Sequence, residues 1–191
     1  VTTFGPATEA ERAVARVKAV HRHITGVAAD GRGYDASDPH LLRWVHVAEV
    51  DSFLAAYQRY GVGERLDQDE RDAYVAETAL VAAKLGISDP PRSQAELRDE
   101  LLGFRAELTG TPQARDAARF LLLRPPLPAP ARVPYAALAA SAVALMPAWT
   151  RRPLRLPYLP LTEATVGRLG GRTITAALHW AMSASEPPSA A

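Results

Sequence analysis

The chain has 191 residues, of which 48% are hydrophobic and 23% are charged, as in a globular protein with a hydrophobic core. Its net charge of +1 argues against a protein that covers nucleic acid or an anionic membrane surface, and the absence of cysteine excludes disulfides and cysteine-ligated metal sites. No apolar run is long enough to cross a bilayer and no signal peptide opens the chain, so we expect no integral membrane segment and a cytoplasmic location.

The first helix is expected to begin near Pro6, because Thr8 and Glu11 have the spacing of a capping box. Gly26 is the expected end of this segment. Four side chains recur at helical spacing and form one apolar stripe: Val14, Val17, His21 and Ile24.

A loop over residues 26–38 leads to the second helix. Tyr34 is the one large side chain in this loop, so we expect it to pack down as an anchor. Asp38 before Pro39 is typical of an N-cap followed by proline at the first helical position, and the helix is expected over residues 40–60. One apolar strip of this helix contains Trp44, Val47 and Leu54, with Asp51 among them. The adjacent strip contains Leu42, His46, Glu49 and Phe53.

Three further helices have clear start signals. A capping pattern at residues 67–70 begins the third helix, which is expected to end at Gly86. A similar pattern at residues 93–96 begins the fourth, which is expected to reach residue 108. Thr111 followed by Pro112 begins the fifth, which is expected to end near residue 123.

The remaining sequence is rich in proline. Residues 124–134 contain five prolines and predict an extended, semi-rigid connection. The sixth helix, over residues 135–146, is apolar nearly all round and is expected to be buried. Further prolines interrupt the next stretch, so its arginines are expected at the surface: Arg151, Arg152 and Arg155.

One or two more helices are expected over residues 162–182, followed by a flexible tail over residues 183–191. Together these elements predict an all-α fold. We expect one compact domain of about seven or eight helices over residues 1–182.

His21 lies on the apolar stripe of the first helix. Such a residue is more often a core histidine that is hydrogen-bonded to a backbone carbonyl than a functional group. The functional alternative is a metal ligand, because burial lowers the pKa of an imidazole and keeps a ring nitrogen unprotonated.

His46 and Glu49 are three residues apart and are therefore neighbours on the helix surface. A carboxylate in this place can orient an imidazole or bind a metal, although a solvated or interhelical ion pair is the simpler interpretation. Asp51 and Glu77 are carboxylates among apolar neighbours, and such groups more often pair with an arginine than take part in catalysis. Motifs typical of hydrolases, kinases and dinucleotide-binding proteins are absent from the sequence.

An ordered set of motifs resembles the MpaB-type oxygenase family, which includes the latex clearing proteins, or rubber oxygenases. The motifs are VHRHITG, then GYDASDPHLLRWVHVAEVDSFLAAYQRYG, then ERDAYVAETALVAAKLGI, and the later LMPAWTRRPLRLP is similar to the family's C-terminal Leu-Pro element. The resemblance is good over residues 16–86 and loose elsewhere. No single motif is diagnostic, but the ordered combination is fairly specific.

The resemblance implies an all-α oxidoreductase with a buried haem b held by one proximal histidine. It implies cleavage of isoprenoid carbon–carbon double bonds with dioxygen, so the expected partners are dioxygen and a hydrophobic small molecule. By motif, His21 corresponds to the metal ligand, and Val17 and Ile24 are expected beside it in the cofactor site. His46 matches a family histidine, and we expect it to form the catalytic or pocket set with Glu49 and Asp51.

The family also places an Arg-x-x-Arg/Lys-Thr motif on a helix upstream of the proximal histidine. This sequence begins after that motif, so it is expected to be a C-terminal portion of the family domain that lacks the N-terminal helices. Two other functions stay open. One is an oxygenase with mononuclear non-haem iron bound by His21, His46 and Glu49, and the other is a non-catalytic helical module that binds an apolar ligand or a partner.

Overall fold

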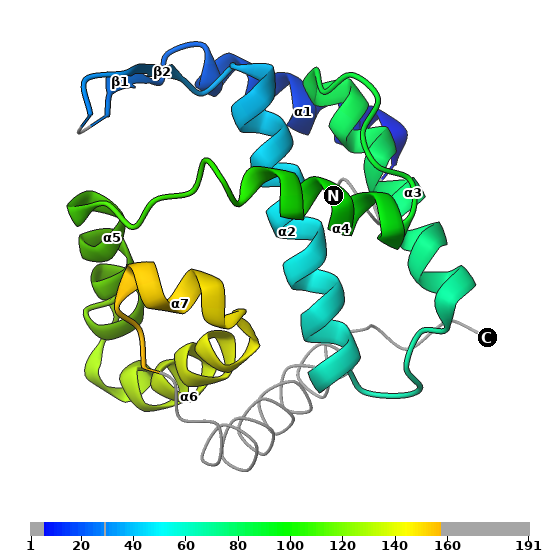
Figure 1. Ribbon diagram of the computed structural model, residues 1–191. Coiled ribbons are helices and arrows are strands. Elements are labelled where there is room, and N and C mark those ends of the chain that lie inside the picture. Colours follow the sequence, from blue (N-terminus) through cyan, green and yellow to red (C-terminus); the bar gives the residue numbers. More distant parts are fainter. Residues whose placement is uncertain (1–5, 29, 158–191) are drawn as a thin grey trace. The chain divides into compact units, whose positions relative to one another are not determined.

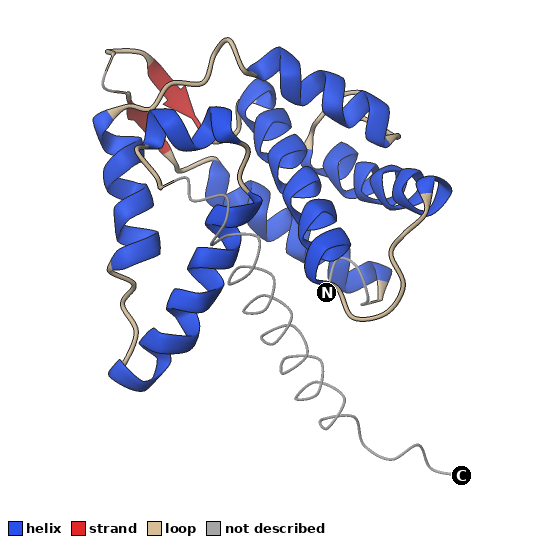
Figure 2. Ribbon diagram, turned by 60° about the horizontal axis from the view of Figure 1, so that its bottom comes forward, coloured by secondary structure: helices blue, strands red, loops and turns tan. Residues whose placement is uncertain are grey.

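The computed structural model describes residues 6–28 and 30–157, and this part of the chain is mainly helical (Figure 1). A short two-stranded hairpin is the one sheet within it (Figure 2). The elements in chain order are α1 (Ala7–His21), β1 (Thr25–Val27), β2 (Gly33–Asp35), α2 (Pro39–Tyr60), α3 (Gln68–Leu85), α4 (Gln94–Phe104), α5 (Pro112–Leu123), α6 (Ala129–Leu145) and α7 (Ala148–Leu154). The predicted all-α class is confirmed, whereas the helices predicted over residues 162–182 and the tail after them lie outside the described residues.

The chain divides into two units. The first unit comprises Val1–Leu54 and Leu66–Leu108, and the second comprises Ala55–Arg65 and Thr109–Ala191. The boundary falls inside α2, so the beginning of this helix belongs to the first unit and its last residues belong to the second.

The predicted helix starts are realised by side chains that bond free backbone N–H groups. Asp67 accepts a 2.9 Å hydrogen bond from the backbone of Glu70, and Glu70 reciprocates by accepting one of 2.9 Å from the backbone of Asp67. Ser93 and Thr111 cap α4 and α5 in the same way, at 3.2 and 3.1 Å. Gly86 ends α3 with φ 112°, a conformation that favours glycine.

The first helix differs from the prediction at both ends. It begins at Ala7 behind Pro6, so Thr8 lies inside the helix and forms no capping box. It ends at His21 rather than near Gly26. The fourth helix also stops earlier than predicted, at Phe104 instead of residue 108.

The segment predicted as a loop contains the β1–β2 hairpin. Gly26 pairs with Tyr34 across the two strands. The Tyr34 ring covers Gly26 so closely that any Cβ at this position would collide with it, which explains why glycine is needed there. Tyr34 was predicted to pack down as an anchor, but it lies on the hairpin and remains 45% exposed.

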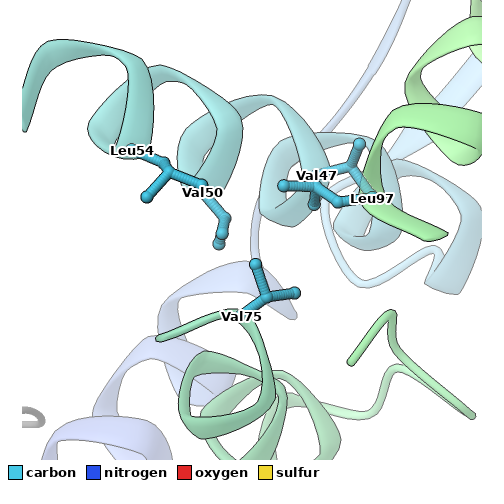
Figure 3. Close-up of a cluster of buried hydrophobic side chains, with 5 residues drawn as sticks. All are labelled: Val47, Val50, Leu54, Val75 and Leu97. Carbon is cyan, nitrogen blue, oxygen red and sulfur yellow. The ribbon is translucent and has the colours of Figure 1, made fainter. Parts of the chain in front are cut away.

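The core of the first unit is a cluster of aliphatic side chains from α2, α3 and α4. Val47, Val50 and Leu54 line one stripe of α2 and meet Val75 of α3 and Leu97 of α4 (Figure 3). All five are at most 4% exposed. Burying each such side chain contributes about 1.5–3 kcal/mol, so this cluster fixes how the three helices pack.

The second unit is built on α5, α6 and α7, together with the end of α2. The Tyr60 hydroxyl donates a 3.1 Å hydrogen bond to the carbonyl of Ser141 in α6. The Arg115 Nε donates at 2.9 Å to the carbonyl of Pro153 in α7. Gly110 lies against the same Pro153 backbone and leaves no room for a Cβ.

The proline-rich stretches are more helical than predicted. Helix α6 begins at Ala129, so residues 129–134 are its first turns rather than an extended connection. Proline is tolerated at the start of a helix because the N–H groups there have no intrahelical acceptor. The stretch predicted to be broken by proline likewise forms α7, which begins behind Pro147 and contains Pro153.

Arg151 was predicted at the surface but is buried, with 5% of its area exposed. Its Nε donates a 2.6 Å hydrogen bond to the carbonyl of Met146, and its Nη2 donates at 3.2 Å to that of Ala144. These are the carbonyls left free where α6 ends, and a guanidinium can satisfy two of them at once. Arg152 and Arg155 are exposed, as predicted.

Across residues 6–28 and 30–157 no single helix is long and apolar enough to cross a membrane. Only α6 and α7 together reach that length and composition, and the chain bends by 118° between them.

Candidate functional site

His21 is the last residue of α1 and is partly buried. Its imidazole forms no hydrogen bond with the residues that the structure describes, although its carbonyl accepts the N–H of Ile24 at 3.0 Å. The expectation of a core histidine bonded to a backbone carbonyl is therefore not met here. A ring nitrogen of His21 is available for another partner.

The apolar stripe around His21 is only partly buried. Val14 is 8% exposed, but Val17 is 39% and Ile24 is 44% exposed. The helix ends at His21, so Ile24 leaves the stripe, and Val14 is the buried residue of α1. The predicted buried stripe is wrong beyond Val14, and His21 borders an open apolar surface.

His46 lies in the middle of α2 beside an arginine–glutamate pair. Its Nε2 is buried and has no hydrogen-bond partner among the described residues. Burial lowers the pKa of His46, with the Glu100 carboxylate opposing this and the Arg43 guanidinium adding to it. The imidazole is therefore neutral at neutral pH and keeps a nitrogen available in a dry setting.

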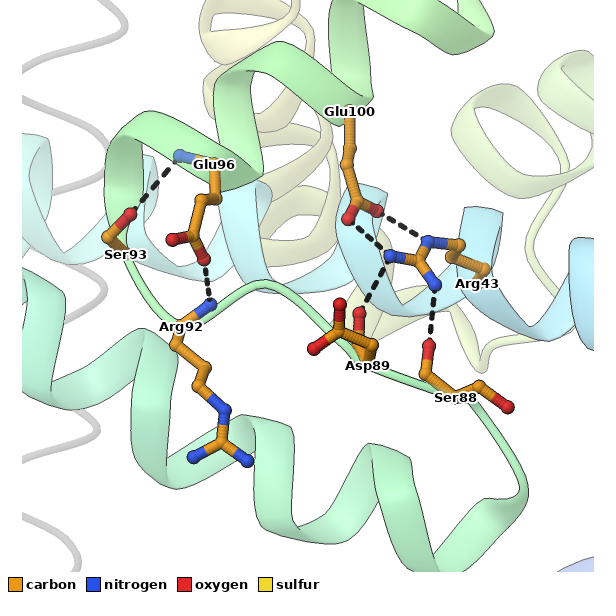
Figure 4. Close-up of polar contacts among 7 residues, drawn as sticks. All are labelled: Arg43, Ser88, Asp89, Arg92, Ser93, Glu96 and Glu100. Carbon is orange, nitrogen blue, oxygen red and sulfur yellow. Dashed lines mark hydrogen bonds and ion pairs between the residues drawn. The ribbon is translucent and has the colours of Figure 1, made fainter.

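The charged pair beside His46 holds three chain segments together. Arg43 binds Glu100 of α4 with two hydrogen bonds, from Nε at 2.8 Å and from Nη2 at 2.6 Å. It also donates to the carbonyls of Ser88 and Asp89, at 2.7 and 2.8 Å (Figure 4). Such a fork-shaped contact is among the stronger charged interactions in proteins, so it fixes the wall against which His46 lies.

Glu49 does not join His46, although the sequence placed them together. Glu49 is exposed, and its charge acts on Tyr74 of α3, where it helps burial to raise the pKa of that phenol. Asp51 is half-buried on the other flank of the core stripe, and burial raises the pKa of its carboxyl against the attraction of Arg98. The three predicted polar residues thus point to different surroundings.

No group of three His, Asp or Glu residues that could hold a metal ion exists within residues 6–28 and 30–157. The facial triad of His21, His46 and Glu49 is therefore not assembled. The carboxylate that acts on His46 is Glu100 of α4, whereas the charge of Glu49 acts on Tyr74 of α3.

A second contact near the site was not predicted. His40, at the start of α2, lies with its Nε2 2.7 Å from the carboxylate of Glu107. Its ring also packs on Phe104, with the ring centroids 5.0 Å apart, and Trp44 packs on the same ring at 5.4 Å. No sequence spacing reveals such a contact, because His40 and Glu107 are 67 residues apart.

The comparison with protein families gives a match over almost the whole chain. Residues 1–180 match the family model described as ER-bound oxygenase mpaB/B'/Rubber oxygenase, catalytic domain. The chain belongs to this family. The match confirms the resemblance found in the sequence and places the protein among oxygenases of the MpaB and rubber oxygenase type.

Neither the curated proteins nor the solved structures that were compared with the chain gave a match. The family assignment therefore rests on the family model and on the motifs in the sequence. As a family of oxygenases, the relatives imply dioxygen and a small-molecule substrate.

Proposed function

We propose that this member of the mpaB/rubber oxygenase family is a haem b-dependent oxygenase of a hydrophobic, isoprenoid-like substrate, with His21 as the iron ligand. The observation that carries the proposal is the family match over residues 1–180. His21 stands in the motif that corresponds to the proximal histidine of the latex clearing proteins, within the best-matching part of the chain.

The residues at the end of α1 fit this cofactor. A haem iron binds a ring nitrogen that is free of other partners, and the porphyrin ring needs apolar contacts at its faces. Val17, four residues before His21, and Ile24, three residues after it, are exposed apolar side chains in the same segment. In this role His21 would bind the iron, and the two aliphatic side chains would pack on the ring and exclude water.

Haem b bound by His21 would supply the dioxygen chemistry of the reaction. His46 fits the part of a polar pocket group, because a neutral imidazole with a free Nε2 can accept or donate one hydrogen bond. Arg43 and Glu100 hold the segments around it. No contact among the described residues joins Glu49 or Asp51 to His46. A catalytic role for these two carboxylates therefore has less support than a pocket role for His46.

The test is haem binding by the 191-residue chain. We expect the purified protein, supplied with haem b, to show a haem absorption band and one haem iron per chain. His21→Ala is expected to lose the band, whereas His23→Ala is expected to keep it. His23 is the matched control because it is an exposed histidine two residues further along.

The same titration distinguishes the two candidate ligands. His46 has the other free imidazole nitrogen, so His46→Ala is compared in parallel. If His46→Ala loses haem while His21→Ala retains it, then His46 and not His21 is the iron ligand. Absence of haem binding in the unaltered chain would contradict the proposal, and circular dichroism of each variant checks that the helices remain folded.

A further inference from the structure

The overall charge of +1 conceals an uneven distribution of charge along the chain. Between Thr109 and Pro157 the sequence contains seven arginines and one acidic residue, Asp116. This stretch belongs to the second unit. Arg151 is buried, but the other six arginines are at least partly exposed. A surface with such an excess of arginine attracts anionic partners, which the near-zero charge of the whole chain does not indicate.

The same unit exposes large apolar side chains where α5 meets α6. Leu123 is 75% exposed and Val133 is 79% exposed, and Leu121 is also open to solvent. These are among the most exposed large hydrophobic residues of the described chain. The Tyr135 hydroxyl donates a hydrogen bond to the carbonyl of Leu121, so the end of α5 is fixed against α6 rather than free to fold away.

A hollow of about 390 Å³ lies where α5 ends, and of these three side chains Leu123 lines it. It is lined by Leu122, Leu123, Arg124, Pro125, Arg132, Tyr135 and Ala136. Neither Arg124 nor Arg132 forms an ion pair with an acidic residue in the described ranges, and Arg132 is steadied by donating its Nε to the carbonyl of Leu127 at 3.2 Å. Two guanidinium groups that have no carboxylate partner in the described ranges, and that lie beside apolar side chains, suit a partner that is both anionic and apolar.

We propose that the α5–α6 end of the second unit is a docking surface for an anionic phospholipid bilayer. Arg124 and Arg132 bind headgroup phosphates, and Leu121, Leu123 and Val133 insert among the acyl chains. Charge complementarity selects this partner, because arginines near an anionic bilayer add to the apolar insertion, whereas one of the two alone gives weak binding. The protein would then meet hydrophobic compounds where they concentrate, in the membrane.

The proposal is tested by flotation of the full chain with phospholipid vesicles. We compare pure phosphatidylcholine with vesicles containing roughly one third phosphatidylserine. Binding is expected for the anionic vesicles and to weaken as salt is raised. The double variant Arg124→Gln, Arg132→Gln is expected to lose roughly 30-fold in affinity, since each arginine near such a surface contributes about fivefold.

The matched control is Arg12→Gln, Arg16→Gln, which removes the same charge from exposed positions of α1 in the first unit. It is expected to bind as the unaltered protein does. Leu123→Asn with Val133→Asn tests the apolar part separately and is expected to weaken binding to both kinds of vesicle. Equal loss in the two arginine variants, or absence of vesicle binding by the unaltered chain, would overturn the proposal.

Discussion

At the scale of single residues, the burial of His46 makes the stability of the fold depend on pH. Its pKa is lowered in the folded protein, chiefly by burial, while in the unfolded chain it is ordinary, about 6.5. The unfolded state therefore takes up a proton before the folded state does. The stabilising contribution is present above pH 6.5 and is lost as the pH falls through the folded pKa.

We expect the free energy of unfolding to fall as the pH is lowered below about 6.5, and this fall to be smaller in His46→Gln. Urea unfolding at a series of pH values measures it. His23→Gln serves as the control, because that histidine is exposed. An unchanged pH profile in His46→Gln would show that the imidazole is not buried in the folded chain.

The ion pair of Arg43 and Glu100 is expected to contribute to the stability of the fold. Replacing Glu100 by Gln leaves a partly buried guanidinium without its carboxylate, and we expect a loss of about 1–3 kcal/mol of stability. The exposed pair of Arg119 and Asp116 is the comparison, and Asp116→Asn is expected to cost less than about 1 kcal/mol. Chemical denaturation of both variants measures the difference, and equal losses would contradict this.

At the scale of elements, the start of α3 is the clearest target. Asp67→Ala removes both the side-chain acceptor for the Glu70 N–H and the capping charge at the positive end of the helix. We expect a loss of about 1 kcal/mol, which thermal unfolding can measure. Asp69→Ala, in the same first turn but outside the capping box, is expected to cost less.

Helix starts could be predicted from the sequence because their signals are local. The capping residues at Asp67, Ser93 and Thr111 each act on a backbone group three residues away, so their pattern is visible in the chain itself. Proline was misleading in α6 and α7. Its effect depends on where the helix begins, and α6 begins at Ala129, with Pro130 in its first turn.

The candidate site was predictable only in part. The motifs propose His21 and His46, but helix periodicity alone could not show that the charge of Glu49 acts on Tyr74 of another helix. The Arg43–Glu100 pair escaped prediction because its partners are 57 residues apart and Arg43 interrupts no pattern. Pairings of this kind depend on how helices cross, which one sequence does not encode locally.

At the scale of the whole molecule, the charge total was misleading. A sum of +1 is uninformative when one stretch carries seven arginines against one acidic residue, and only the division into units shows that these belong together. The proposed haem chemistry is assigned to residues of the first unit and the proposed membrane contact to the second. The experiments on His21 and on Arg124 with Arg132 are therefore independent, and either proposal can fail without the other.

The division of α2 between the two units affects synthesis on the ribosome. Tyr60 completes its surroundings only when Ser141 has been made, 81 residues later. At roughly 5–20 residues per second, the end of α2 waits for several seconds, longer than its first half, whose partners α3 and α4 are made earlier. During that interval Tyr60 lacks the contact with α6 that it has in the finished second unit.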